Sequence, residues 1–201
     1  QALPAGTHLI LKLGAPPRLT TWFSVRDELV KAQEQARPFR AQDREALAGI
    51  LRNSVRHHLI SDAPVGLFLS AGVDSTLITA LAAEFEGETL RTFTLGFDEY
   101  RGTAYDEVPF AERSAVKRGT HHDTRWIRRT DFEGELAGIL AAMDQPTTDG
   151  VNIYLVCREA ARAGLKVALT GLGGDELFGG YPSFRDVPKI ARWPNPARYV
   201  P

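Results

Sequence analysis

The sequence is poor in cysteine, in long apolar runs and in excess charge. Its single cysteine, Cys157, excludes an internal disulfide and is typical of a reducing cytoplasm, where we expect the protein to reside. No apolar run approaches the ~18 residues that a transmembrane helix needs, so we expect no membrane partner. The formal net charge of −1 provides no basic field, and we therefore expect no nucleic-acid partner.

Apolar runs alternate with amphipathic stretches over most of the chain. Four runs predict parallel strands, at residues 65–69, 90–95, 122–127 and 166–170. Four stretches predict helices, at residues 76–85, 106–118, 131–143 (broken by Pro146) and 152–163. A helix capped by Asp43 precedes them, with one apolar face made of Leu47, Ile50, Leu51, Val55 and Leu59. The alternation predicts an α/β fold with a doubly wound, mostly parallel, Rossmann-like sheet.

The rest of the chain is organised differently. Residues 1–24 predict a short β-hairpin, with β-prone segments His8–Leu13 and Leu19–Phe23 around a turn. Residues 25–42 are charged and predict a linker with some helix, so that the main domain covers residues 43–201. The proline-rich tail from Pro182 shows no closing element, and we expect the natural chain to continue.

One loop of the predicted sheet carries the strongest functional signal. It reads Ser70-Ala71-Gly72-Val73-Asp74-Ser75 and joins the first strand to its helix. Strand, tight loop and helix together aim backbone N–H groups and a helix N-terminus at a phosphate. Asp74 is placed to hold a magnesium ion that bridges phosphates, although a helix N-cap is the alternative role for it. No lysine follows Gly72, which excludes a Walker A loop.

A second glycine-rich loop follows the last predicted strand. Gly171-Leu172-Gly173-Gly174-Asp175-Glu176 departs from the dinucleotide pattern G-x-G-x-x-G because Glu176 replaces the third glycine. Ligands bind at the carboxyl ends of parallel strands, so we expect both loops to share one site. Asp175 and Glu176 have the alternative role of complementing a helix dipole.

These motifs resemble those of a known family. Residues 70–75 resemble the S-G-G-x-D-S loop of ATP pyrophosphatases, with Ala71 in place of one glycine. Together with Thr170–Tyr181 they closely resemble the synthetase domain of glutamine-hydrolysing asparagine synthetases, which carry S-G-x-G-x-D-E-x-F-G-G-Y there. Further matches are Thr92–Phe97, Tyr105–Glu107, Asp144–Pro146 and, as the end of a glutaminase domain, Leu3–Gly6. The resemblance implies an adenine nucleotide alpha-hydrolase-like fold.

The resemblance also implies a reaction and its participants. In this family the side-chain carboxylate of aspartate attacks the α-phosphate of ATP, pyrophosphate leaves, and ammonia from glutamine attacks the acyl-adenylate, which gives asparagine and AMP. The implied cofactors are ATP and Mg²⁺. The implied partners are aspartate, a glutaminase domain that supplies ammonia, and a second copy in a homodimer. Residues 1–24 would then be the end of the glutaminase domain, and residues 43–201 a C-terminally incomplete ATP-pyrophosphatase synthetase domain.

The resemblance assigns roles to individual residues. Those expected to hold the pyrophosphate moiety are Ser70, Gly72, Asp74 and Ser75. Those expected to contact adenosine are Leu69, Leu95, Thr170 and Gly171. Asp74 and Asp175 are the expected magnesium ligands, and both are catalytic together with Glu176, a partner of the metal site.

Some positions depart from the family pattern. Leu172 stands where many asparagine synthetases carry an acidic residue that helps deprotonate the attacking ammonium, and leucine cannot accept a proton. Either another group serves, or the acceptor is another carboxylate: a sugar acid, a peptide or a lactam precursor. A non-catalytic nucleotide-binding module is the third alternative. The chain begins with Gln1 instead of a nucleophilic cysteine, so we expect it not to hydrolyse glutamine by itself.

Overall fold

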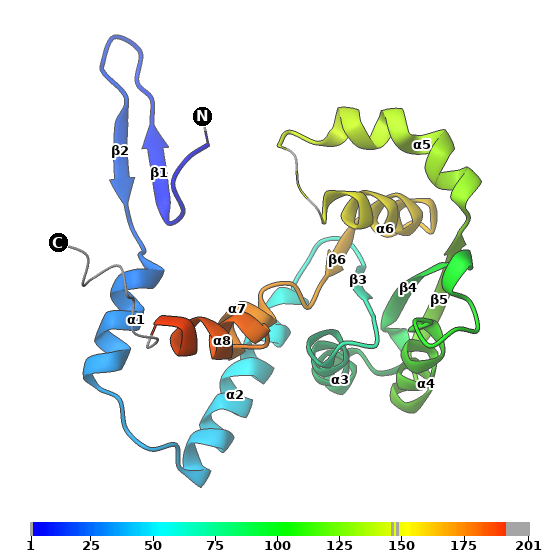
Figure 1. Ribbon diagram of the computed structural model, residues 1–201, viewed down its shortest axis with the longest axis horizontal. Helices are drawn as coiled ribbons and strands as arrows, with labels where there is room; N and C mark the ends of the chain where they lie inside the picture. The colour runs from blue at the N-terminus through cyan, green and yellow to red at the C-terminus, as the bar shows by residue number, and fades with distance from the viewer. Residues whose placement is uncertain (1, 146, 148, 192–201) are drawn as a thin grey trace, which may run out of the picture. The chain divides into compact units, whose positions relative to one another are not determined.

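The computed structural model describes residues 2–145, 147 and 149–191 of the chain (Figure 1). The chain divides into two compact units, Gln1–Leu47 and Ala48–Pro201. Within the described residues, no helix is both long and apolar enough to cross a membrane. Pro146, at which a helix break is predicted, and the tail prolines beyond residue 191 lie outside the described residues.

The first unit contains the predicted hairpin. Strands β1 (Thr7–Ile10) and β2 (Arg18–Thr21) pair antiparallel, with Leu9 opposite Leu19. Within the segment predicted as a linker, helix α1 (Val25–Glu34) begins where the Ser24 hydroxyl accepts a hydrogen bond from the backbone N–H of Asp27. The hairpin is therefore confirmed with shorter strands, and the expected helical content of the linker is concentrated in α1.

Helix α2 (Ala41–His58) runs from the first unit into the second. The carboxylate of Asp43, in its first turn, accepts a hydrogen bond from the backbone N–H of Arg40 at 2.8 Å. Within the second unit, Leu51, Val55 and Leu59 pack in one core cluster. Ile50 is 65% exposed and Leu47 is 37% exposed, so the packed face is narrower than the predicted apolar face. The packed face follows the four-residue spacing of Leu51, Val55 and Leu59.

Four parallel strands form the sheet of the second unit. They are β3 (Val65–Phe68), β4 (Arg91–Phe97), β5 (His121–Ile127) and β6 (Val167–Leu169), in the order β5-β4-β3-β6. Helices α3 (Val73–Glu86) and α4 (Val108–Arg118) lie on one face of this sheet, and α6 (Gly150–Arg162) lies on the other, with α5 (Arg129–Ala142) beside it (Figure 1). The predicted doubly wound α/β fold is confirmed.

Residue alternation along the strands accounts for the two covered faces. Leu67 packs with the α2 and α3 side chains, and Leu69 packs with Ala111 of α4. Phe68, between them in sequence, points to the opposite face, where it contacts Phe93 at a centroid distance of 6.4 Å. A strand with both faces covered reads as a continuous apolar run, which is why this strand was visible in the sequence.

The strand order creates a switch point at β3. The chain leaves β3 towards β4 and β5 on one side, and it returns to β6 on the other side. Leu67 of β3 pairs with Leu169 of β6. The loops that follow these two strands are therefore neighbours at the carboxyl edge of the sheet, where ligands bind in open α/β sheets.

The segment after residue 173 contains two short helices, α7 (Gly174–Phe178) and α8 (Pro182–Ala191). Helix α8 lies in the tail from Pro182, and its described side chains are exposed or partly exposed, so the absence of a closing element there stays a prediction. Pro182 is the first residue of α8. Proline is well tolerated there, because the N–H group at the first position of a helix makes no hydrogen bond within the helix. Phe184, Val187 and Ile190 recur at a spacing of three, which is helical periodicity.

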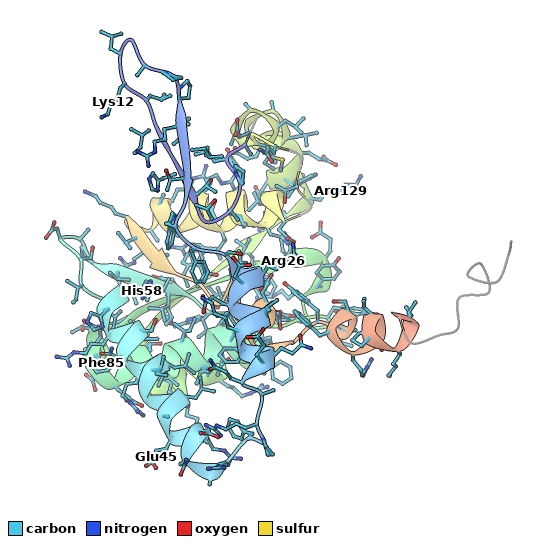
Figure 2. All side chains as sticks on the ribbon, turned by 90° about the vertical axis from the view of Figure 1, so that its left-hand side faces the viewer. Lys12, Arg26, Glu45, His58, Phe85 and Arg129 are labelled. Atoms are coloured by element: carbon cyan, nitrogen blue, oxygen red, sulfur yellow. The ribbon has the colours of Figure 1, made fainter. Side chains whose placement is uncertain are left out.

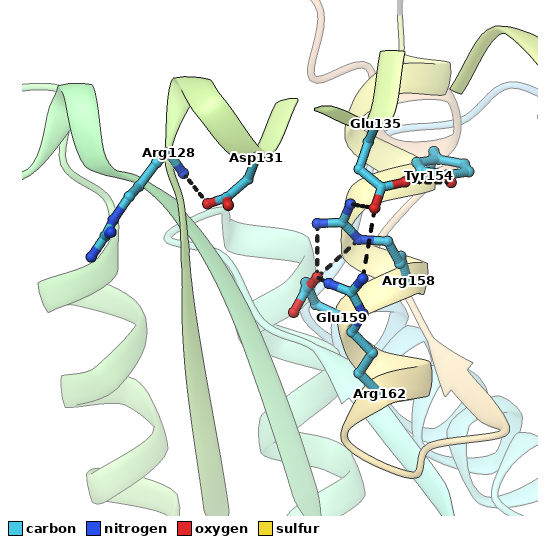
Figure 3. Close-up of polar contacts among 7 residues, drawn as sticks. All are labelled: Arg128, Asp131, Glu135, Tyr154, Arg158, Glu159 and Arg162. Carbon is cyan, nitrogen blue, oxygen red and sulfur yellow. Dashed lines mark hydrogen bonds and ion pairs between the residues drawn. The ribbon is translucent and has the colours of Figure 1, made fainter. Parts of the chain in front are cut away.

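An ion-pair network joins α5 to α6 (Figure 3). Arg158 contacts Glu135 of α5 at 2.7 Å and Glu159 at 2.8 Å, and its side chain is 14% exposed. Arg162 contacts Glu159 at 2.7 Å, and the hydroxyl of Tyr154 donates to Glu135 at 3.1 Å. The two arginines and two carboxylates balance in charge, which keeps the burial of Arg158 and Glu159 tolerable.

Replacing Arg158 by methionine tests this network. We expect Arg158→Met to lower the free energy of unfolding by about 3 kcal/mol, because two mostly buried carboxylates lose a partner. Arg129→Met is the control: Arg129 is 80% exposed on α5 and pairs with Glu133 (Figure 2), so its loss should stay under about 1 kcal/mol. Urea denaturation followed by circular dichroism measures both. Equal losses would contradict the assigned role of the network.

Candidate active site

The loop after β3 is closed by the side chain of Ser75. This residue is 7% exposed, and its hydroxyl oxygen lies 2.9 Å from the Ser70 hydroxyl oxygen. The Ser75 hydroxyl also accepts from the backbone N–H of Ser70 at 3.2 Å and lies 3.1 Å from the carbonyl oxygen of Gly72. These bonds hold the loop in a tight turn, with Ser70 and Gly72 exposed at its tip.

Helix α3 begins directly after this turn. Gly72 is its N-cap residue in an extended conformation, and no side chain in the described part of the structure caps the helix. Asp74 lies in the first turn, so the alternative that Asp74 is the N-cap is wrong. A helix N-terminus without a side-chain cap presents backbone N–H groups and the positive end of the helix dipole to an anion.

The second glycine-rich loop leads from β6 into α7. The hydroxyl of Thr170 accepts from the backbone N–H of Leu172 at 3.3 Å. Gly173 has a φ of 96°, a left-handed conformation that favours glycine. This turn places Asp175 and Glu176 in the first turn of α7, directly after Gly174, which lies against Asp74 of the first loop.

Two glycines bring the loops into contact. A Cβ atom at Gly171 would lie 2.8 Å from the backbone nitrogen of Ser75 and 3.1 Å from Cβ of Asp74. A Cβ atom at Gly174 would overlap the Asp74 carboxylate. The backbone of the second loop therefore lies directly against Asp74, and glycine is required there for close approach.

The two leucines predicted to contact adenosine lie apart from this junction. The side chain of Leu69 is 2% exposed and packs against α4, while Leu95 packs in the core beside Ile127. Sequence analysis missed Thr94, whose buried hydroxyl donates to the carbonyl oxygen of Leu69 at 2.5 Å. This bond orients the backbone just before the loop, and threonine in a strand carries no local signal for it.

Glu176 has a partner that sequence analysis also missed. The hydroxyl of Tyr181 donates to Oε1 of Glu176 at 3.0 Å. This hydrogen bond, followed by desolvation and the negative charges of Glu176, Asp175 and Asp149, raises the pKa of Tyr181 above its ordinary value. Tyr181 therefore stays protonated at neutral pH and remains a donor.

The carboxylates at the junction suit a magnesium ion. Among the residues that the structure describes, no group of three or more His, Cys, Asp or Glu side chains could hold a metal ion. Asp74 lies against Gly174, the residue that precedes Asp175. Mg²⁺ is commonly held by one or two carboxylates, with phosphates and waters as the other ligands. Asp74 and Asp175 fit that mode of binding when a phosphate completes the site.

Filling the junction with a methyl group tests its tightness. We expect Gly171→Ala to lower the free energy of unfolding by about 1–3 kcal/mol, because the new Cβ meets the backbone of Ser75. Gly134→Ala is a matched control: Gly134 lies within α5 with no described atom within 4 Å of an added Cβ, and it should gain about 0.5–1 kcal/mol. Thermal unfolding of both variants measures the difference, and an unchanged Gly171→Ala protein would refute the contact.

Comparison with known proteins identifies the family of the chain. Residues 46–199 match the sequence model of the family described as asparagine synthase. The chain is 38% identical over 136 residues to asparagine synthetase (glutamine-hydrolysing) 1 of Bacillus subtilis, a match that covers 67% of this chain. It is 38% identical over 144 residues, or 71% of its length, to a putative asparagine synthetase (glutamine-hydrolysing) of Mycobacterium tuberculosis.

These matches cover part of longer proteins, since the chain spans 21% of the length of each of these two relatives. Among solved structures, the NH3-dependent NAD synthetase of Campylobacter jejuni gives a TM-score of 0.41 at 15% identity, covering 63% of this chain and 54% of that one. The family assignment rests on the sequence matches alone. Because the family model covers more than half of the residues, the chain belongs to the asparagine synthase family.

Proposed function

We propose that this chain is the ATP-using part of an amide-forming ligase. In this proposal ATP and the side-chain carboxylate of aspartate form an acyl-adenylate with release of pyrophosphate, and ammonia derived from glutamine then displaces AMP to give asparagine. The observation that carries the proposal is the junction at which the uncapped N-terminus of α3, Asp74 and the Asp175 loop meet. Relatives named asparagine synthetase support the choice of reaction.

The junction has groups suited to a polyphosphate. Ser70, Gly72 and Ser75 would bind the pyrophosphate moiety together with the N–H groups of α3, whose dipole favours negative charge there. Asp74 and Asp175 would hold Mg²⁺, which when bound neutralises charge on the leaving pyrophosphate. Glu176 would support the metal site from the position next to Asp175.

The nucleoside would lie along the carboxyl edge of the sheet. Leu69 and Leu95 keep their side chains in the core, so we infer that they contribute backbone groups to adenosine. Thr170 and Gly171 would contact it from the loop after β6. A rigid edge made of strand ends positions the α-phosphate for attack, which is the main requirement of phosphoryl transfer.

The remaining assignments concern the parts around this site. We infer that residues 1–24 are the end of a glutaminase domain, that residues 25–42 link it to the synthetase domain of residues 43–201, and that ammonia arrives from that glutaminase. A cytoplasmic location and a homodimer complete the proposal. The single cysteine supports the location.

Product analysis tests the reaction. With ATP, Mg²⁺, ammonium and aspartate, we expect AMP, pyrophosphate and asparagine in equal amounts from the 201-residue chain or a longer protein that contains it.

Asp74→Asn should lower AMP formation by at least about 100-fold, because charge stabilisation at the phosphates is lost. Cys157→Ser, remote from the junction in sequence and on the exposed side of α6, should keep full activity. Unchanged turnover in Asp74→Asn would refute the metal site, and ATP binding without AMP formation would favour the non-catalytic alternative.

A second acceptor class is favoured by Leu172. Its side chain is 74% exposed on the loop that carries Asp175, where it offers an apolar surface and no base. If aspartate gives no AMP, a panel of sugar acids, peptides and lactam precursors identifies the carboxylate used.

Restoring an acid at this position is informative for the aspartate reaction. We expect Leu172→Glu to raise ammonia-dependent amidation about 10-fold if the missing base limits the rate. Leu172→Gln, which has a similar shape and no basic carboxylate, is the control. Equal rates in Leu172→Glu and the unsubstituted protein would indicate that another group already accepts the proton.

A further inference from the structure

The segment that links α7 to α8 folds back over the acidic residues of α7. Gly179 ends α7 in a left-handed conformation, with a φ of 69°. The backbone N–H of Gly180 then donates to the carbonyl oxygen of Asp175 at 2.9 Å. The three residues Gly179, Gly180 and Tyr181 form a return segment that passes beside Asp175 and Glu176.

Gly180 lies against the Asp175 carboxylate itself. A Cβ atom at Gly180 would overlap Oδ1 of Asp175 and would lie 3.2 Å from its Cα. The φ of Gly180 is not positive, so an alanine there strains no backbone angle. The glycine is therefore explained by the space that the carboxylate occupies, since any side chain would push the carboxylate into another rotamer.

Tyr181 holds the second carboxylate from the same segment. Its hydroxyl donates to Glu176 at 3.0 Å, and its ring lies parallel to that of Phe184 with a centroid distance of 6.4 Å and an interplanar angle of 7°. The hydrogen bond from this hydroxyl to the carboxylate limits the rotamers of Glu176. One segment thus contacts both acidic side chains. Gly180 leaves space for the Asp175 carboxylate, and the Tyr181 hydroxyl binds the Glu176 carboxylate.

We propose that the return segment Gly179–Tyr181 is a positioning element that holds the Asp175 and Glu176 carboxylates in the orientation that Mg²⁺ and the polyphosphate require. The inference rests on the proposed function and deepens it, because it names residues that act on the metal site through its ligands. Gly180 acts through Asp175, and Tyr181 acts through Glu176.

The glycine is tested by metal binding. Calorimetric titration of Mg²⁺ at fixed ATP should show about 10-fold weaker binding for Gly180→Ala, close to the loss in Asp175→Asn. The double variant Gly180→Ala/Asp175→Asn should lose no more than Asp175→Asn alone, since Gly180 acts through that carboxylate. Gly134→Ala, an open helical site, is the matched control and should bind as the unsubstituted chain does. Equal Mg²⁺ affinity in Gly180→Ala and Gly134→Ala, or additive losses in the double variant, would overturn the role of Gly180.

The tyrosine is tested by removing its hydroxyl while keeping its ring. Tyr181→Phe should lower kcat about 5-fold with the KM for ATP within about 2-fold, because the carboxylate position matters most in the transition state. Adding Glu176→Gln should cause no further loss beyond that of Glu176→Gln alone. Tyr154→Phe is the control, since it removes a similar tyrosine–glutamate bond of 3.1 Å between α5 and α6. Equal kcat values in Tyr181→Phe and Tyr154→Phe would overturn the role of Tyr181.

The outcomes separate the two proposals. Binding of Mg·ATP by the unsubstituted chain, with no difference between Gly180→Ala and Gly134→Ala, overturns the positioning role and leaves the proposed function standing. Absence of Mg·ATP binding by the unsubstituted chain overturns the proposed function and this inference with it. Circular dichroism of each variant confirms that the comparison is made between folded proteins.

Discussion

The close approach of two loops at the ends of β3 and β6 is the constraint on which the site depends. Gly171 and Gly174 leave no room for a Cβ atom against Ser75 and Asp74. This approach requires the register that pairs Leu67 with Leu169, and the register in turn requires strands with apolar residues on both faces. The packing of the sheet therefore determines the geometry of its carboxyl edge.

Electrostatics at this edge combine opposite tendencies. The uncapped N-terminus of α3 favours an anion, whereas Asp74 and Asp175 place negative charge beside it. In the proposed function, this combination of a helix N-terminus and carboxylates would bind a magnesium-bound polyphosphate. The return segment adds a further requirement, because Gly180 restricts the carboxylate of Asp175 and Tyr181 that of the neighbouring Glu176.

The far face of the sheet is stabilised by different means. Apolar clusters around Phe93 and Ile127 attach α6 and α5 to the sheet, and the network around Arg158 joins the two helices to each other (Figure 3). A charged network gives directional contacts that apolar packing lacks. The helices that cover this face are thus placed by both kinds of interaction.

Local residue patterns determined the kinds of elements, the parallel sheet and the loop around Asp74, because burial on both strand faces and glycine-containing turns leave local signals. They also indicated the family. The exposure of Ile50 and the contacts of Thr94, Gly180 and Tyr181 were decided by tertiary structure. A glycine needed for a distant carboxylate, or a hydroxyl that supports a neighbouring strand, looks in sequence like any other glycine or threonine, since the partner is defined only when the chain has folded.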